Sequence, residues 1–197
     1  MPERIVLDPD ERRVIGVLIE KSLCTPQYYP LTVNALVSGS NQKSNRDPIV
    51  EYVEDDVEEA LERLRQRGLA TVIYPAGSRA PKWRQEMTSA LELDGRGMAV
   101  IAELFLRGAQ TTGELRARAS RMKPIPDRGA LEEVLEGLLE RRPPLIVRLS
   151  PEGVARGVRV THNFHAEEEL AEIIAAEEAG APPRRESGGS RPGSSQL

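Results

Sequence analysis

An internal repeat constrains the fold of this chain more than any other feature of its sequence. Three helical patterns followed by two short apolar, β-branched patterns occur over residues 8–86, and the same order returns over residues 98–164. Residues 58–62 read EEALE and residues 132–136 read EEVLE, which places matching positions of the two third helices 74 residues apart. Two copies of one small unit therefore account for most of the 197 residues.

The two copies differ in length between their first and third helices. Val14 matches Val100, 86 residues later, whereas the third helices are offset by 74 residues, so the first copy is 12 residues longer. The extra residues fall on both sides of its second helix, inside residues 21–46, a window of 26 residues without Asp or Glu. This acid-free window is what the first unit has added to the shared scaffold.

Residue spacing predicts the individual elements. Asp8 as N-cap, Pro9 at the first helical position and Glu11 three residues after the cap mark the start of the first helix. Thr111 and Glu114 have the same capping-box spacing and open a helix that reaches about residue 120. Further helices are expected over residues 31–39, 53–67, 98–108, 127–141 and 167–178, and strands over residues 49–52, 69–74, 82–86, 145–149 and 158–164.

Three helices followed by a two-stranded hairpin is the element order of a winged helix-turn-helix domain. The expected fold class is therefore α+β, mainly helical, with two tandem winged helix-turn-helix domains over residues 1–88 and 89–165. Residues 166–197 add an acidic helix and a flexible tail, because residues 181–197 have the Pro, Arg, Gly and Ser composition that is typical of disorder.

Composition limits the compartment and the chemistry. The single cysteine, Cys24, cannot form an internal disulfide, and no segment is a long apolar run, which favours a cytoplasmic protein without a membrane span. Cys24 is expected to be a small buried residue, because the sequence offers no base to activate its thiol. No phosphate-binding loop, dinucleotide fingerprint or nucleophile elbow is present, and His162 and His165 lack a second ligand pair. We therefore expect no enzyme activity, cofactor, metal or small-molecule substrate.

Acidic residues gather in the third helix of the first unit. Residues 51–62 contain seven acids and no base, and they include the half of that helix that enters the major groove in a DNA-reading winged helix. Because acids repel phosphate, this helix is not expected to read DNA. The candidate acidic partner face comprises Asp55, Glu58, Glu59 and Glu62. The alternative is that these acids only stabilise the start of the helix and remain solvated.

Basic residues gather immediately afterwards. Residues 63–85 contain six bases and no acid, and three of these bases lie on the predicted hairpin, or wing: Arg79, Lys82 and Arg84. They are candidate phosphate contacts. The same bases could instead meet the acidic helix of a second copy in a homodimer, or belong to an ordinary mixed surface.

The most distinctive polar run lies between the second and third helices of the first unit. It comprises Asn41, Gln42, Lys43, Ser44, Asn45 and Arg46. We interpret it as a candidate interaction loop, since amides and Arg can bond bases, phosphates or a peptide backbone. The alternative is a structural loop whose Asn and Ser side chains cap nearby helix ends.

Three aromatic residues belong to the same unit. Tyr28 and Tyr29 are expected to be split, with one ring in the core and the other at the rim. Trp83 is expected either to pack under the wing or to lie in an interface.

Several stretches of the sequence resemble the YceH family of bacterial proteins. The residues that carry this resemblance are YYPLTVNALV and NQKSNRDP, followed by ALERLRQRGLA and LRGAQTTGELRARASRM. The resemblance covers residues 10–165 and leaves out the tail. It implies a cytosolic bacterial protein with tandem winged-helix domains, and it brings no established activity and no catalytic residues.

Two functions remain open from the sequence. In the first, the chain is a non-enzymatic regulatory or adaptor protein that acts through contact with a protein partner or with a second copy of itself. In the alternative, it is a DNA-binding transcriptional regulator that contacts phosphates through the first wing and residues 41–46.

Overall fold

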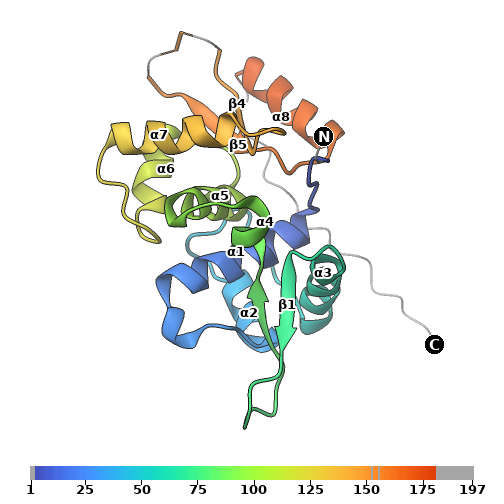
Figure 1. Ribbon diagram of the computed structural model, residues 1–197. Coiled ribbons are helices and arrows are strands. Elements are labelled where there is room, and N and C mark those ends of the chain that lie inside the picture. Colours follow the sequence, from blue (N-terminus) through green and yellow to red (C-terminus); the bar gives the residue numbers. More distant parts are fainter. Residues whose placement is uncertain (1–2, 152, 155, 181–197) are drawn as a thin grey trace, which may run out of the picture.

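The computed structural model describes residues 3–151, 153–154 and 156–180 (Figure 1). Within these residues the chain has an α+β structure, mainly helical, with two small antiparallel sheets. The first unit contains α1 (Pro9–Cys24), a short 3₁₀ turn (Pro26–Tyr28), α2 (Val33–Ser40), α3 (Glu54–Gln66), β1 (Ala70–Ile73) and β2 (Lys82–Gln85). The second unit contains α5 (Gly95–Arg107), β3 (Gln110–Thr111), α6 (Thr112–Ala119), α7 (Arg128–Leu139), β4 (Ile146–Arg148) and β5 (Arg159–His162). A short helix, α4 (Met87–Leu91), joins the units, and α8 (Glu167–Glu178) follows the second.

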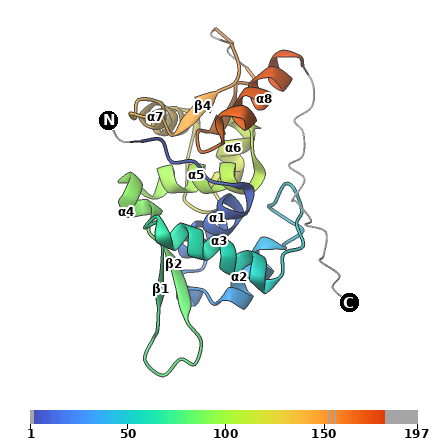
Figure 2. The ribbon, with the colours of Figure 1, turned by 90° about the vertical axis from the view of Figure 1, so that its right-hand side faces the viewer.

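The same order of elements thus occurs in both units. In the second unit, β3, β5 and β4 form one antiparallel sheet in that order. In the first unit, β1 and β2 form a hairpin, and Leu31 pairs with Trp83 where the second unit has its additional strand. The views in Figures 1 and 2 agree that the β1–β2 hairpin projects from the body on the side away from the second unit.

Helices α1 and α5 pack against each other at the centre of the molecule (Figure 1). Every residue from 11 to 20 in α1 is buried, because α3 and β2 cover one side of the helix and α5 covers another. Gly16 marks the close approach: a Cβ atom added there would lie 3.1 Å from Leu106 Cδ2 and 3.2 Å from Phe105 Cβ. The buried apolar residues of both units consequently form one continuous core.

Local sequence signals account for most of the helix ends. The capping box that was expected at Asp8 and Glu11 is confirmed, with both side chain to backbone hydrogen bonds at 2.8 Å. The capping box at Thr111 and Glu114 is confirmed in the same way. Gly68 follows the last residue of the α3 cap and has φ of +69°, a conformation that glycine adopts without steric cost.

Three expectations are corrected. Residues 49–52 are not a strand, because the backbone of Tyr52 pairs with the side chain of Asn41 and not with a neighbouring strand. Helix α5 begins at Gly95, three residues before the expected start, because the Asp94 carboxylate caps it. Cys24 is exposed, since it is the last residue of α1 and lies beyond the packed part of that helix.

The aromatic side chains of the first unit take separate places. The tyrosine pair is split as expected: Tyr28 is 73% exposed, whereas Tyr29 is half-buried and its hydroxyl accepts a hydrogen bond from the Gln85 backbone. Trp83 is buried under the hairpin.

The C-terminal helix is confirmed over the expected residues, Glu167–Glu178. The flexible tail expected over residues 181–197 lies outside the described residues. The division into domains at residues 88 and 165 stays a prediction.

Substitution of Gly16 by Val should destabilise the protein by about 1–3 kcal/mol, because the added methyl groups overpack the α1–α5 contact. Urea denaturation followed by circular dichroism measures this loss. Gly113→Ala is the control, because an added Cβ there meets no atom within 4 Å and alanine favours a helix. Equal free energies of unfolding for the wild type and Gly16→Val would contradict the close approach.

Candidate functional site

The candidate interaction loop, residues 41–46, is held from inside by two buried arginines. Arg46 forms a bidentate pair with Glu20, with both N–O distances at 2.9 Å, and its Nε donates to the carbonyl of Gly39 at 3.0 Å. Arg13 of α1 donates to the carbonyls of Ser40 and Pro48, on either side of the loop. Arg46, a candidate phosphate contact from the sequence, is therefore buried and unavailable to a phosphate in this arrangement.

The asparagines at the two ends of this loop also form internal bonds. The Asn41 amide donates to and accepts from the backbone of Tyr52, both at 2.8 Å. Asn45 has φ of +58°, a left-handed conformation that Asn tolerates, and its Oδ1 accepts from Arg107 of the second unit at 2.8 Å. Lys43 and Ser44 are exposed and Gln42 is half-buried, so the outward part of the loop is limited to its middle.

A buried ionic cluster joins this loop to the second unit. Glu20 accepts from Arg46 and, at 2.8 Å, from Arg121, the second residue after α6. Arg121 also reaches Glu103 of α5 at 3.2 Å, and the Arg107 Nε lies 3.1 Å from the same carboxylate. Both carboxylates are buried in the core. The cluster therefore fixes the loop, α1, α5 and the end of α6 relative to one another.

The two carboxylates of this cluster differ in pKa. Burial raises the pKa of Glu20, but hydrogen bonds and charge from Arg46 and then Arg121 outweigh it and hold the value at about 2. Burial also raises the pKa of Glu103, and there the attraction of Arg121 and Arg107 does not fully compensate. Glu20 is thus the firmly ionised member of the cluster.

The bases of the hairpin are only partly available. Arg84 donates to Glu86 at 2.7 Å. Arg79 is exposed and Lys82 half-buried, and neither has an ion-pair partner among the residues that the structure describes. The three other bases of residues 63–85 pair with acids: Arg63 with Asp8, Arg65 with Glu62 and Arg67 with Glu11.

The candidate acidic face on α3 is likewise divided. Glu62 pairs with Arg65 at 2.8 Å, and Glu59 lies 3.8 Å from Arg63. Asp55 and Glu58 are exposed, and within the described part of the chain neither forms an ion pair. The face that can meet a partner is therefore the N-terminal half of α3.

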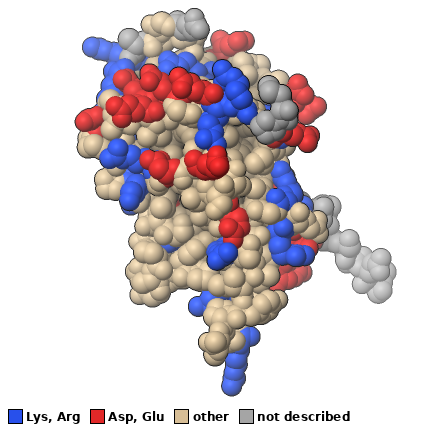
Figure 3. Space-filling model, viewed as in Figure 1, with Lys and Arg blue, Asp and Glu red and all other residues tan. Residues whose placement is uncertain are grey.

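A second acidic band lies on α7. Figure 3 shows acidic side chains running along this helix on one face of the molecule. The exposed members at the end of α7 and along it are Glu132, Glu133, Glu136 and Glu140, and of these Glu132 pairs with Arg128. The structure brings this band to the second unit and the basic hairpin to the opposite end of the molecule.

The two histidines lie together in the core. The His162 and His165 rings stack with centroids 3.8 Å apart, and His165 Nδ1 lies 3.0 Å from Glu169 of α8. Arg12 pairs with the same carboxylate at 2.6 Å. Burial lowers the pKa of both histidines, so they are neutral core residues that help to fix α8. Sequence spacing alone had not placed them on one face.

Two further searches concern the described residues only. No group of three or more His, Cys, Asp or Glu side chains in that part of the chain is placed to hold a metal ion. Nor does any described helix combine the length and apolar character needed to cross a lipid bilayer.

Substitution of Glu20 by Gln should lower the free energy of unfolding at pH 7 by about 3–5 kcal/mol, because it leaves Arg46 buried without a countercharge. The folded-state pKa of Glu20, about 2, is below the unfolded value of 4.5. Its contribution is therefore present above pH 4.5 and is lost as the pH falls toward 2. Urea denaturation between pH 3 and pH 7 should show the difference between wild type and variant shrinking as the pH falls.

The matched control is Glu62→Gln, which breaks an exposed pair and should cost at most about 1 kcal/mol. A Glu20→Gln effect no larger than this control would show that the buried cluster does not hold the units together.

Comparison with known proteins finds one matching family, described as "Protein of unknown function, DUF480", over residues 7–154. A protein named UPF0502 protein from Geotalea uraniireducens is 50% identical over 165 residues, covering 84% of this chain and 75% of the relative. A UPF0502 protein from Geobacter sulfurreducens is 45% identical over 179 residues, covering 91% and 80%. A third, from Koribacter versatilis, is 44% identical over 160 residues, covering 81% and 74%.

Proposed function

This chain belongs to the DUF480, or UPF0502, family of bacterial proteins, and from that premise we propose that it is a non-enzymatic adaptor that binds protein. Each unit is proposed to be a winged helix-turn-helix domain, in keeping with the YceH-like motifs of the sequence. The support is the element order of three helices and a hairpin, with β3, β5 and β4 forming the three-stranded sheet that such a domain requires.

The acidic third helices carry the proposal. In a DNA-reading winged helix the third helix enters the major groove, where acids are repelled by phosphate. Here Asp55 and Glu58 are exposed on α3 without an ion-pair partner in the described chain, and α7 carries the second acidic band. Such surfaces favour a basic protein surface as the partner.

A second copy of this chain supplies such a surface. Arg79 and Lys82 lie on the projecting hairpin, at a distance from the acidic helix surfaces of the second unit (Figures 1 and 3). Their charge is not neutralised by the ion pairs that occupy Arg63, Arg65 and Arg67. Self-association through basic hairpin and acidic helix is therefore the form of the proposal that this charge distribution favours. A cytoplasmic location is part of the same proposal.

Reversing charge at Asp55 and Glu58, both to Lys, should shift the protein from an assembly toward a single chain. The reason is that like charges would then face the basic hairpin. Light scattering after size exclusion at about 0.1 M salt measures the mass, since surface charges are only partly screened there. Glu168→Lys with Glu178→Lys is the control of equal charge change on the exposed side of α8. A wild-type protein that stays a single chain at every concentration would contradict self-association.

The alternative function is binding of DNA phosphates through the hairpin. The observation in its favour is that Arg79 and Lys82 are unpaired in the described chain and project from the body. Fluorescence anisotropy with a duplex at about 50 mM salt should then show binding that weakens steeply as salt is added. Arg79→Ala with Lys82→Ala should reduce the salt slope by about two. Absence of binding to any duplex at low salt would exclude this alternative.

A further inference from the structure

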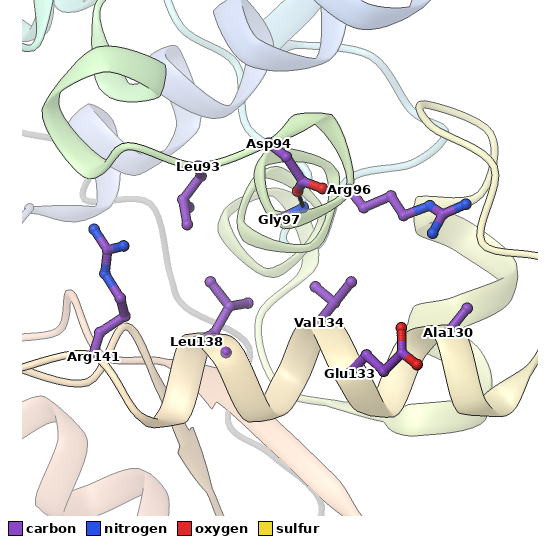
Figure 4. A pocket seen from close by; sticks show the side chains of 10 residues that line it. Leu93, Asp94, Arg96, Gly97, Ala130, Glu133, Val134, Leu138 and Arg141 are labelled. Carbon is purple, nitrogen blue, oxygen red and sulfur yellow. Dashed lines mark hydrogen bonds between the residues drawn. The ribbon is translucent and has the colours of Figure 1, made fainter.

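A groove lies between the N-terminus of α5 and one side of α7 (Figure 4). Its volume is about 350 Å³, and its apolar floor is formed by Leu93, Val134 and Leu138. Two glycines, Gly97 and Gly137, also line it, together with the carboxylates of Asp94 and Glu133. The groove thus combines an apolar floor with two acidic groups and has little side-chain bulk.

The sister unit shows what occupies the corresponding place. Asp8 and Asp94 are the N-caps of α1 and α5, 86 residues apart, and Glu59 corresponds to Glu133 at the offset of 74 residues. At the same offset, Gly137 corresponds to Arg63. In the first unit the Arg63 Nε lies 3.2 Å from Asp8 Oδ2, and its Nη1 lies 3.8 Å from Glu59 Oε2.

The second unit therefore keeps both carboxylates and lacks the arginine. A Cβ atom added at Gly137 would meet no atom within 4 Å, so the space of the missing side chain is open. Asp94 accepts from the Gly97 backbone at 2.8 Å, and neither Asp94 nor Glu133 has an ion-pair partner among the described residues. The groove offers the acceptors for a guanidinium without containing one.

The two arginines that border the groove do not fill this role. Figure 4 shows Arg96 and Arg141 at opposite ends of it. Arg96 donates to the carbonyl of Pro124 at 3.0 Å, and Arg141 donates to the carbonyl of Leu91. Their charges lower the attraction for a cation, but the acidic band of α7 beside the groove, which includes Glu136 and Glu140, acts in the opposite direction.

We infer that this groove binds an arginine side chain of a second copy of the chain, namely Arg79 at the tip of the β1–β2 hairpin. Arg79 is exposed and has no ion-pair partner in the described residues. Its neighbours Gly77, Ser78 and Ala80 are small and exposed, so the tip can approach a groove lined by glycines. The inference deepens the proposed self-association and rests on it, by naming the two surfaces that meet.

The contact joins different surfaces on the two copies. An arrangement of this kind is head-to-tail, and it leaves one free hairpin and one free groove at the ends of every open assembly. Two variants that each block one side should therefore complement each other when mixed. This property separates the inference from a general attraction between acidic and basic surfaces.

The first variant, Gly137→Arg, supplies the arginine that the sister unit has at this position, and it should fill the groove from within. The second variant, Arg79→Glu, removes the incoming side chain. Each alone should weaken self-association about tenfold or more, measured by sedimentation velocity. Gly113→Arg, at another open glycine, is the matched control and should associate as the wild type does. Circular dichroism verifies that every variant is folded.

The decisive measurement is the mixture. Gly137→Arg retains Arg79, and Arg79→Glu retains an open groove, so together they should form a pair of one copy each and nothing larger. A folded Gly137→Arg protein that associates like the wild type would overturn the inference. Retained association of Arg79→Glu, with loss on reversal of Arg184 and Arg185 to Glu in the full chain, would assign the groove to segment 181–197 and also overturn it.

A separate probe distinguishes failure of this inference from failure of the proposed function. A synthetic peptide of residues 74–82 should shift NMR signals of Gly97 and Gly137 in the Asp55→Lys, Glu58→Lys protein, whose own association is weakened. The shifts should be absent in that protein when it also carries Gly137→Arg. Absence of any shift at millimolar peptide would overturn the groove assignment, even where the wild type self-associates through α3.

Discussion

The buried pairing of Glu20 with Arg46 and Arg121 is the interaction on which the arrangement of the two units depends. A carboxylate in the core is stable only with countercharges close by, and here those come from a loop of the first unit and from the segment after α6. The same pairing removes Arg46 from the surface and aligns α1 with α5. The buried charge therefore specifies one relative position of the units, which apolar contacts between the two helices alone would define less sharply.

Local signals made much of the fold predictable from the sequence. Capping boxes at Asp8 and Thr111 involve residues three positions apart, so they could be identified without knowledge of the fold. Residues 49–52 were misread because Ile, Val and Tyr favour strands, whereas the actual partner of the Tyr52 backbone is the Asn41 side chain. The pairing of Arg121 with Glu20 spans 101 residues and had no sequence signal.

The candidate surfaces were predictable in composition but not in availability. Acidic and basic segments could be read from the sequence, yet the pairing of Arg65 with Glu62 and of Arg84 with Glu86 depends on side-chain positions. The groove beside α7 could not be foreseen, because it arises from the absence of a side chain at Gly137. Only the three-dimensional comparison of the two units shows that an arginine occupies the equivalent place in the first.

The close contact at Gly16 has a consequence for how this chain can evolve. Each unit uses the other as part of its own interior, so a gene break or a domain exchange between them would leave the apolar sides of α1 and α5 open to water. The duplication that the repeat records has thus become irreversible in practice: the copies can diverge in sequence, as Arg63 and Gly137 have, but they are inherited together.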